Sequence, residues 1–85
     1  MNKINWRPKA AKQLMKLPKP DQKTIRDEVG EQLIQFPECR NVKQLTNHAY
    51  SYRLRVGRYR VFFEFDGSVK IVNIEEVKKR DEHTY

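Results

Sequence analysis

Hydrophobic positions near the start of the chain change from a period of two to a helical period. Residues 2–6 alternate polar and apolar, with Ile4 and Trp6 on one side, and this alternation predicts a short first strand. Pro8 suits the first turn of a helix because its missing N–H needs no partner there, and the prolines at 18 and 20 end that helix. The apolar stripe of this first helix consists of Ala11, Leu14, Met15 and Leu17.

A second helix is predicted from about residue 20 to residue 36. Asp21 near its start is favourable because a carboxylate there faces the positive end of the helix dipole, and Pro37 ends the helix. Its apolar residues recur at spacings of three and four, which indicates one buried face. They are Ile25, Val29, Leu33 and Phe36. The two helices, joined by a proline turn, are expected to form a helical hairpin.

Residues 38–48 show no period and are expected to be irregular, but from residue 50 the period is two. Gly57 predicts a tight turn between two strands, and Asp66 with Gly67 predicts a second hairpin that leads to a last strand at about 68–77. The alternating apolar residues are Tyr50, Tyr52, Leu54, Val56, Tyr59, Val61, Phe63 and Phe65. The order strand–helix–helix–strand–strand–strand predicts an α+β fold in which the hairpin of helices covers one face of a small, mainly antiparallel sheet.

Length and composition narrow the function classes. The 85 residues make one domain spanning the whole chain, too short for a doubly wound nucleotide-binding fold. No apolar run approaches the length of a membrane span, and no apolar segment typical of a secretion signal follows the start. The single cysteine, Cys39, cannot form an internal disulfide or a thiolate zinc cluster and fits a reducing cytoplasm. We therefore expect a cytoplasmic protein without cofactor, metal or membrane contact.

The distribution of charge points to a polyanionic partner. Eighteen Lys and Arg against eleven Asp and Glu give a net charge of +7, and no carboxylate lies between Glu38 and Glu64. Strand alternation should turn arginines away from the apolar side chains, onto the sheet face that the helices leave open. These arginines are Arg53, Arg55, Arg58 and Arg60. Such an array could contact successive phosphates of a nucleic acid, although a merely solvated face remains the alternative.

The C-terminal residues add groups that suit phosphoryl chemistry. Lys78, Lys79 and Arg80 supply cations directly after the last strand. His83 supplies a titratable imidazole and Tyr85 a phenol. A frayed polar tail is the alternative interpretation.

Residues 52–61, with the sequence YRLRVGRYRV, resemble the hallmark hairpin of the RelE/ParE toxin superfamily of bacterial and archaeal toxin–antitoxin systems. The resemblance extends over nearly the whole chain, from the first strand and helical hairpin through a Lys43-x-Leu45 element to the basic tail. It implies a RelE-like fold. It also implies a type II toxin that cuts mRNA codons in the ribosomal A site by metal-independent attack of the ribose 2′-OH on the adjacent phosphate.

The resemblance also implies residue roles. Arg60, Arg80, His83 and Tyr85 match catalytic positions, while RNA binding is expected from Lys43, Arg53, Arg55, Arg58, Lys78 and Lys79. Members of the family often carry lysine where this chain has Arg53 and Arg55, and arginine cannot serve as a base because its pKa stays above about 12. The role of general base would then pass to His83 or Tyr85.

The resemblance implies partners and leaves two other functions open. A small acidic antitoxin should neutralise the toxin, the ribosome and mRNA should be its targets, and operator DNA should be contacted only through the antitoxin. The ParE branch shares the fold but inhibits DNA gyrase without cutting RNA. A non-catalytic module that binds nucleic acid or antitoxin would use the same basic face.

Overall fold

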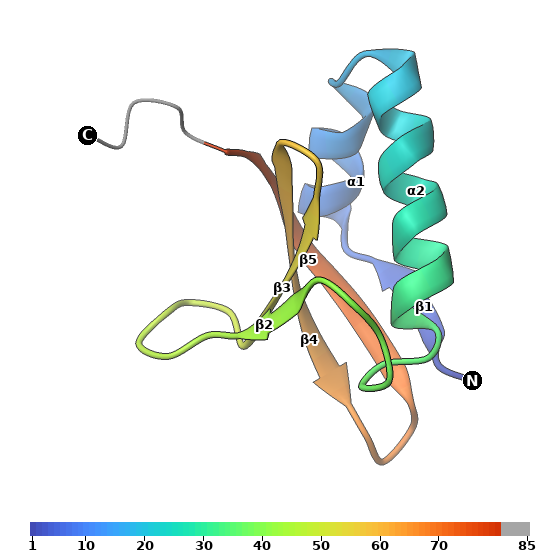
Figure 1. Ribbon diagram of the computed structural model, residues 1–85, viewed down its shortest axis with the longest axis vertical. Helices are drawn as coiled ribbons and strands as arrows, with labels where there is room; N and C mark the ends of the chain where they lie inside the picture. Colours follow the sequence, from blue (N-terminus) through green and yellow to red (C-terminus); the bar gives the residue numbers. More distant parts are fainter. Residues whose placement is uncertain (81–85) are drawn as a thin grey trace.

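Within residues 1–80, two helices cover one face of a five-stranded sheet (Figure 1). The computed structural model describes residues 1–80. The elements are β1 (Lys3–Trp6), α1 (Pro8–Met15), α2 (Lys19–Leu33), β2 (Val42–Gln44), β3 (Tyr52–Val56), β4 (Tyr59–Asp66) and β5 (Ile71–Lys79). The strands lie in the order β1-β5-β4-β3-β2, with β1 parallel to β5 and every other pair antiparallel. The predicted α+β architecture is confirmed.

The sheet contains one strand more than predicted. Residues 38–48 were expected to be irregular, but β2 pairs with β3 through the register Val42–Leu54, Lys43–Arg53 and Gln44–Tyr52. Three residues with one apolar side chain are too short to produce a visible alternation. The consequence for the site is that Lys43 lies beside Arg53 on an added edge strand.

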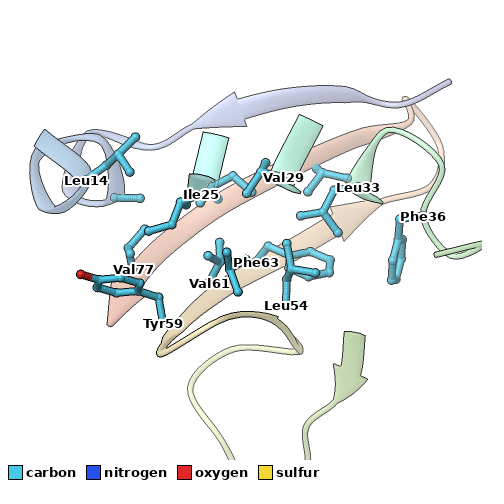
Figure 2. Packing of buried hydrophobic residues seen from close by; sticks show 14 residues of the cluster. Leu14, Ile25, Val29, Leu33, Phe36, Leu54, Tyr59, Val61, Phe63 and Val77 are labelled. Carbon is cyan, nitrogen blue, oxygen red and sulfur yellow. The ribbon is translucent and has the colours of Figure 1, made fainter. Parts of the chain in front are cut away.

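The core lies between the two helices and the three central strands (Figure 2). The predicted residues Ile25, Val29, Leu33 and Phe36 are all buried, but α2 ends at Leu33, three residues earlier than predicted, and Phe36 lies in the turn that follows. The predicted stripe of α1 is only partly correct. Met15 is 74% exposed, and Ala10 is buried in its place, because α1 contacts the sheet through the pair Ala10 and Leu14, which are four residues apart on one face.

Side chains fix the ends of the helices to the rest of the fold. The buried Gln22 in α2 donates to the carbonyl oxygens of Met15 (3.2 Å) and Leu17 (2.7 Å), so it satisfies carbonyls left open where α1 ends. The hydroxyl of Tyr59 donates to Asp21 Oδ2 at 2.6 Å and joins the β3–β4 hairpin to the first turn of α2.

The two sheet hairpins differ in their turns. Val56 pairs with Tyr59, so Gly57 (φ +55°) and Arg58 form a two-residue turn as predicted. The Asp66–Gly67 turn is longer than predicted, because the left-handed residue is Lys70 (φ +55°) and β5 begins only at residue 71. This strand then continues to residue 79, past the predicted end. Within residues 1–80, no helix combines the length and apolar character needed to cross a membrane.

Candidate functional site

A row of three cations crosses three neighbouring strands on the sheet face opposite the helices. Arg55 in β3 is in register with Arg60 in β4, and Arg60 is in register with Lys78 in β5. All three side chains are exposed, whereas Leu54, Val61 and Val77, which alternate with them, are buried under the helices. Strand alternation therefore separates the charges from the core, as the sequence predicts.

Arg53 and Lys43 extend this row toward the β2 edge. Arg53 lies two residues before Arg55 in β3, on the same face, and is in register with Lys43 of β2 and with Phe62 of β4. Unlike its neighbours it is half-buried, and its Nε is buried without a hydrogen-bond partner among the described residues. An unpaired buried donor is uncommon and marks a place where an acceptor could bind.

Arg80 joins the same cluster from the end of β5. Its backbone N–H donates to the carbonyl oxygen of Arg58 at 2.6 Å, which holds the chain beside the β3–β4 turn. A small hollow of about 90 Å³ opens there. It is lined by Arg53, Arg55, Gly57, Tyr59, Arg60 and Arg80. The term "arginine cluster" below refers to Arg53, Arg55, Arg60 and Arg80.

The arginine cluster is not neutralised by carboxylates of the described chain. Burial lowers the pKa of Arg53, and the charges of Arg60, Arg55 and Arg80 lower it further, which requires all three to be near. Within residues 1–80 the salt bridges are Lys9–Glu76 and Lys23–Asp27, and neither includes a cluster arginine. The hollow is thus suited to a phosphate, and its guanidinium groups could stabilise charge that develops on it.

Two predicted RNA-binding residues lie elsewhere. Arg58 was expected to share the open face, but it occupies the turn, where the pleat is interrupted, and it lines a separate hollow with Asp21 and Thr24 on the helix side. Lys79 is in register with Tyr59, whose side chain faces the helices, so alternation puts Lys79 on that side too. The predicted catalytic residues His83 and Tyr85 lie outside the described residues.

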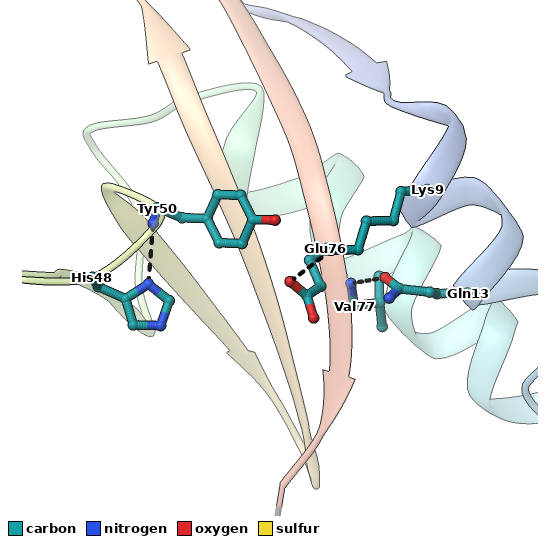
Figure 3. A network of polar contacts seen from close by, with 6 residues as sticks. All are labelled: Lys9, Gln13, His48, Tyr50, Glu76 and Val77. Atoms are coloured by element: carbon teal, nitrogen blue, oxygen red, sulfur yellow. Dashed lines mark hydrogen bonds and ion pairs between the residues drawn. The ribbon is translucent and has the colours of Figure 1, made fainter.

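The open face carries an aromatic cluster that the sequence analysis missed. Phe62 follows Arg60 on this face, yet it is only 6% exposed because the segment between β2 and β3 folds over it with His48 and Tyr50. Tyr50 points across the strands toward the ion pair of Lys9 and Glu76 (Figure 3). The hydrogen bond from Lys9 to Glu76 raises the pKa of Lys9, and the nearby Tyr50 hydroxyl raises it further. The sequence did contain a signal for this covering segment, because Phe62 is a large apolar residue at a strand position that alternation assigns to the open face.

Solved structures of toxins share this fold. A chain of the RelBE2 toxin–antitoxin complex from Mycobacterium tuberculosis is 24% identical, with 93% of this chain and 98% of that chain covered and a TM-score of 0.77. The isolated RelE toxin of E. coli is 15% identical, with coverage of 99% and 89% and a TM-score of 0.80. A chain of the archaeal RelE–RelB complex from Pyrococcus horikoshii is 23% identical, with coverage of 95% and 97% and a TM-score of 0.70.

A search of curated proteins found no match. The family model described as "ParE toxin of type II toxin-antitoxin system, parDE" matches residues 4–84, nearly the whole chain. This match agrees with the RelE-like order of helices and strands and with the arginine-bearing β3–β4 hairpin. The chain therefore belongs to the ParE toxin family of type II toxin–antitoxin systems, within the RelE/ParE superfamily.

Proposed function

We propose that this toxin is a ribosome-dependent endoribonuclease that cuts mRNA in the A site. The observation that carries the proposal is the arginine cluster, in which four guanidinium groups from β3, β4 and the end of β5 converge, with no neutralising acid among residues 1–80. Planar guanidinium groups bind phosphate oxygens with paired donors, and several around one linkage would hold it while charge grows on it.

The proposed reaction is an internal transesterification. The ribose 2′-oxygen attacks the adjacent phosphorus and the bond from phosphorus to the 5′-oxygen breaks, leaving a 2′,3′-cyclic phosphate and a free 5′-OH. One proton must leave the 2′-OH and one must reach the 5′-oxygen. Because the arginines remain protonated, we assign proton transfer to His83 and Tyr85 in the tail.

The proposed partners follow from charge and from the relatives. The complexes from Mycobacterium tuberculosis and Pyrococcus horikoshii contain a toxin with its antitoxin. For this chain we propose a small acidic antitoxin that masks the arginine cluster, with operator DNA contacted only through it. The site of action would be the translating ribosome in the cytoplasm.

Cleavage on translating ribosomes tests the proposal. The wild-type chain should produce codon-registered cuts with cyclic-phosphate ends, and Arg60→Ala and Tyr85→Ala should each relieve growth inhibition with an unchanged circular dichroism spectrum. Arg26→Ala is the matched control, because Arg26 is an exposed arginine on α2, away from the sheet. Full toxicity of both site variants would show that the site lies elsewhere.

The family model itself favours a second candidate, because its description is that of ParE toxins. A gyrase inhibitor would cause gyrase-dependent DNA breaks and would leave mRNA intact on ribosomes. Binding to nucleic acid or antitoxin with neither effect would instead identify a non-catalytic module. The three outcomes are exclusive in a single set of assays with purified ribosomes and gyrase.

A further inference from the structure

His48, Tyr50 and Phe62 form an aromatic platform beside the arginine cluster. The ring of His48 lies 5.0 Å from that of Phe62, with 17° between their planes, so the two are stacked. The ring of Tyr50 lies 5.7 Å from Phe62 at 32°. Phe62 is buried beneath them, whereas His48 is exposed. One face of the imidazole therefore rests on Phe62 and the opposite face is open to solvent.

The segment that carries His48 is held by hydrogen bonds at several points. The backbone N–H of Tyr50 donates to His48 Nδ1 at 3.1 Å (Figure 3). The N–H of Ser51 donates to Glu64 Oε2 at 2.9 Å, and that of Leu45 donates to the carbonyl oxygen of Ser51 at 2.8 Å. The imidazole is thus preorganised, which lowers the entropy lost when a ligand stacks on it.

The platform and the arginine cluster are neighbours on one sheet face. Phe62 is directly opposite Arg53 in the β3–β4 register, and the Cβ atoms of such pairs lie about 5 Å apart. The next row along the same face is Arg55–Arg60. A strand whose phosphates occupy the arginine cluster would accordingly bring an adjacent base over His48.

We propose that His48 provides a stacking surface for a nucleobase next to the phosphate held by the arginine cluster. Proteins that bind single strands commonly combine a cationic groove for the backbone with aromatic rings for the bases. The inference rests on the proposed function in so far as RNA is the ligand. It adds a binding subsite made by the segment between β2 and β3.

The hydrogen bond at Nδ1 distinguishes stacking from proton transfer. Because Nδ1 accepts from Tyr50 N–H, the proton of the neutral ring is assigned to Nε2. The lone pair that a general base needs is already engaged. The ring's contribution is therefore its flat surface, and another aromatic ring should replace it.

Fluorescence binding of a short RNA tests the platform. The probe is a single strand of about ten nucleotides that contains 2-aminopurine and is 2′-O-methylated so that it cannot be cut. His48→Ala should weaken binding about tenfold and abolish the stacking-dependent quenching, whereas His48→Phe, which loses only the hydrogen bond from Tyr50 N–H, should keep most of the binding and the quenching. Thr46→Ala, an exposed change in the same segment, is the control. On an oligonucleotide with abasic sites, His48→Ala and wild type should bind equally.

Two results would overturn the inference. Wild-type affinity of His48→Ala would show that no base stacks there, and equal loss in His48→Phe and His48→Ala would show that the imidazole nitrogen is what matters. The proposed function is tested separately. If the His48 variants change RNA binding as predicted but the wild-type chain leaves mRNA on ribosomes uncut, the proposed function is wrong and the stacking surface stands. Cleaved mRNA with no effect of His48→Ala on probe binding would reject the platform alone.

Discussion

Replacing Arg60 with glutamine should stabilise the fold while weakening the site. Arg60 stands between Arg55 and Lys78 in the cross-strand register, so it has a like charge on each side. Like charges directly opposite in a sheet destabilise by roughly 0.2–1 kcal/mol for each pair. Because all three side chains are exposed and screened by solvent, we expect the free energy of unfolding to rise by about 0.5–1 kcal/mol.

Urea unfolding followed by the fluorescence of Trp6 measures this change. Trp6 is the only tryptophan and packs half-buried against the core, so its emission reports loss of the fold. The midpoint should increase without a change in slope, and Tm should rise by about 2–8 °C for a domain of this size. At 1 M salt the Debye length is about 3 Å, and most of the gain should disappear.

Arg26→Gln is the matched control, because it removes one exposed charge from α2 and the two residues have similar helix propensities. If Arg60→Gln were no more stable than wild type at low salt, or matched Arg26→Gln, repulsion across the strands would be negligible. The interpretation of the arginine cluster as a site under electrostatic strain would then be wrong. An equal gain at high and low salt would also refute it.

Other changes probe the parts that hold the site. Tyr59→Phe removes the 2.6 Å hydrogen bond to Asp21 and should lower the free energy of unfolding, measured with urea, by about 1–3 kcal/mol. That hydrogen bond and burial raise the pKa of Tyr59. The stability that the bond contributes is therefore fully present below the ordinary phenol pKa of about 10 and is lost as pH rises through the higher pKa of the folded state. Tyr59→Phe should lack this loss of stability at alkaline pH. Gly30→Ala should raise Tm, because an added Cβ meets no atom within 4 Å in the middle of α2. Gly57→Ala should lower stability by about 1 kcal/mol despite open space, because its φ is +55°, and an unchanged Tm would refute the assignment of that turn. Gln22→Met should lower Tm, because it leaves carbonyls at the end of α1 unpaired; no change would mean that water replaces the amide.

Periodic segments were predictable because their pattern is repeated. The face of α2 has three apolar positions at helical spacing, Phe36 continues the spacing just after the helix, and each of the four is buried in the structure. The alternation in β3 and β4 likewise determined which face Arg53, Arg55 and Arg60 would share. In both cases one physical rule acts at every position, so a local exception cannot reverse the prediction.

Turns and short segments were less predictable, because a single contact decides their course. Arg58 follows Gly57 in a turn, where alternation no longer holds, and it therefore lines the hollow that contains Asp21 and not the arginine cluster. Tyr50 continues the alternation of β3 in the sequence but lies over Phe62, before the strand begins. The segment between β2 and β3 is held over the open face by tertiary hydrogen bonds, and such bonds produce no periodic pattern in the sequence.

At the arginine cluster, burial of the core brings cations together that repel one another. Alternation in β3, β4 and β5 gives inward positions such as Leu54, Val61 and Val77 to the core, and the core in turn fixes the register that sets Arg55, Arg60 and Lys78 side by side. The hydrophobic core thus holds together a face whose own charges repel, and an anion on that face would relieve the repulsion. Any ligand that binds the folded state alone stabilises it by mass action. Sulfate should therefore raise the Tm of wild type more than that of Arg60→Gln, and equal shifts would mean that the anion binds elsewhere.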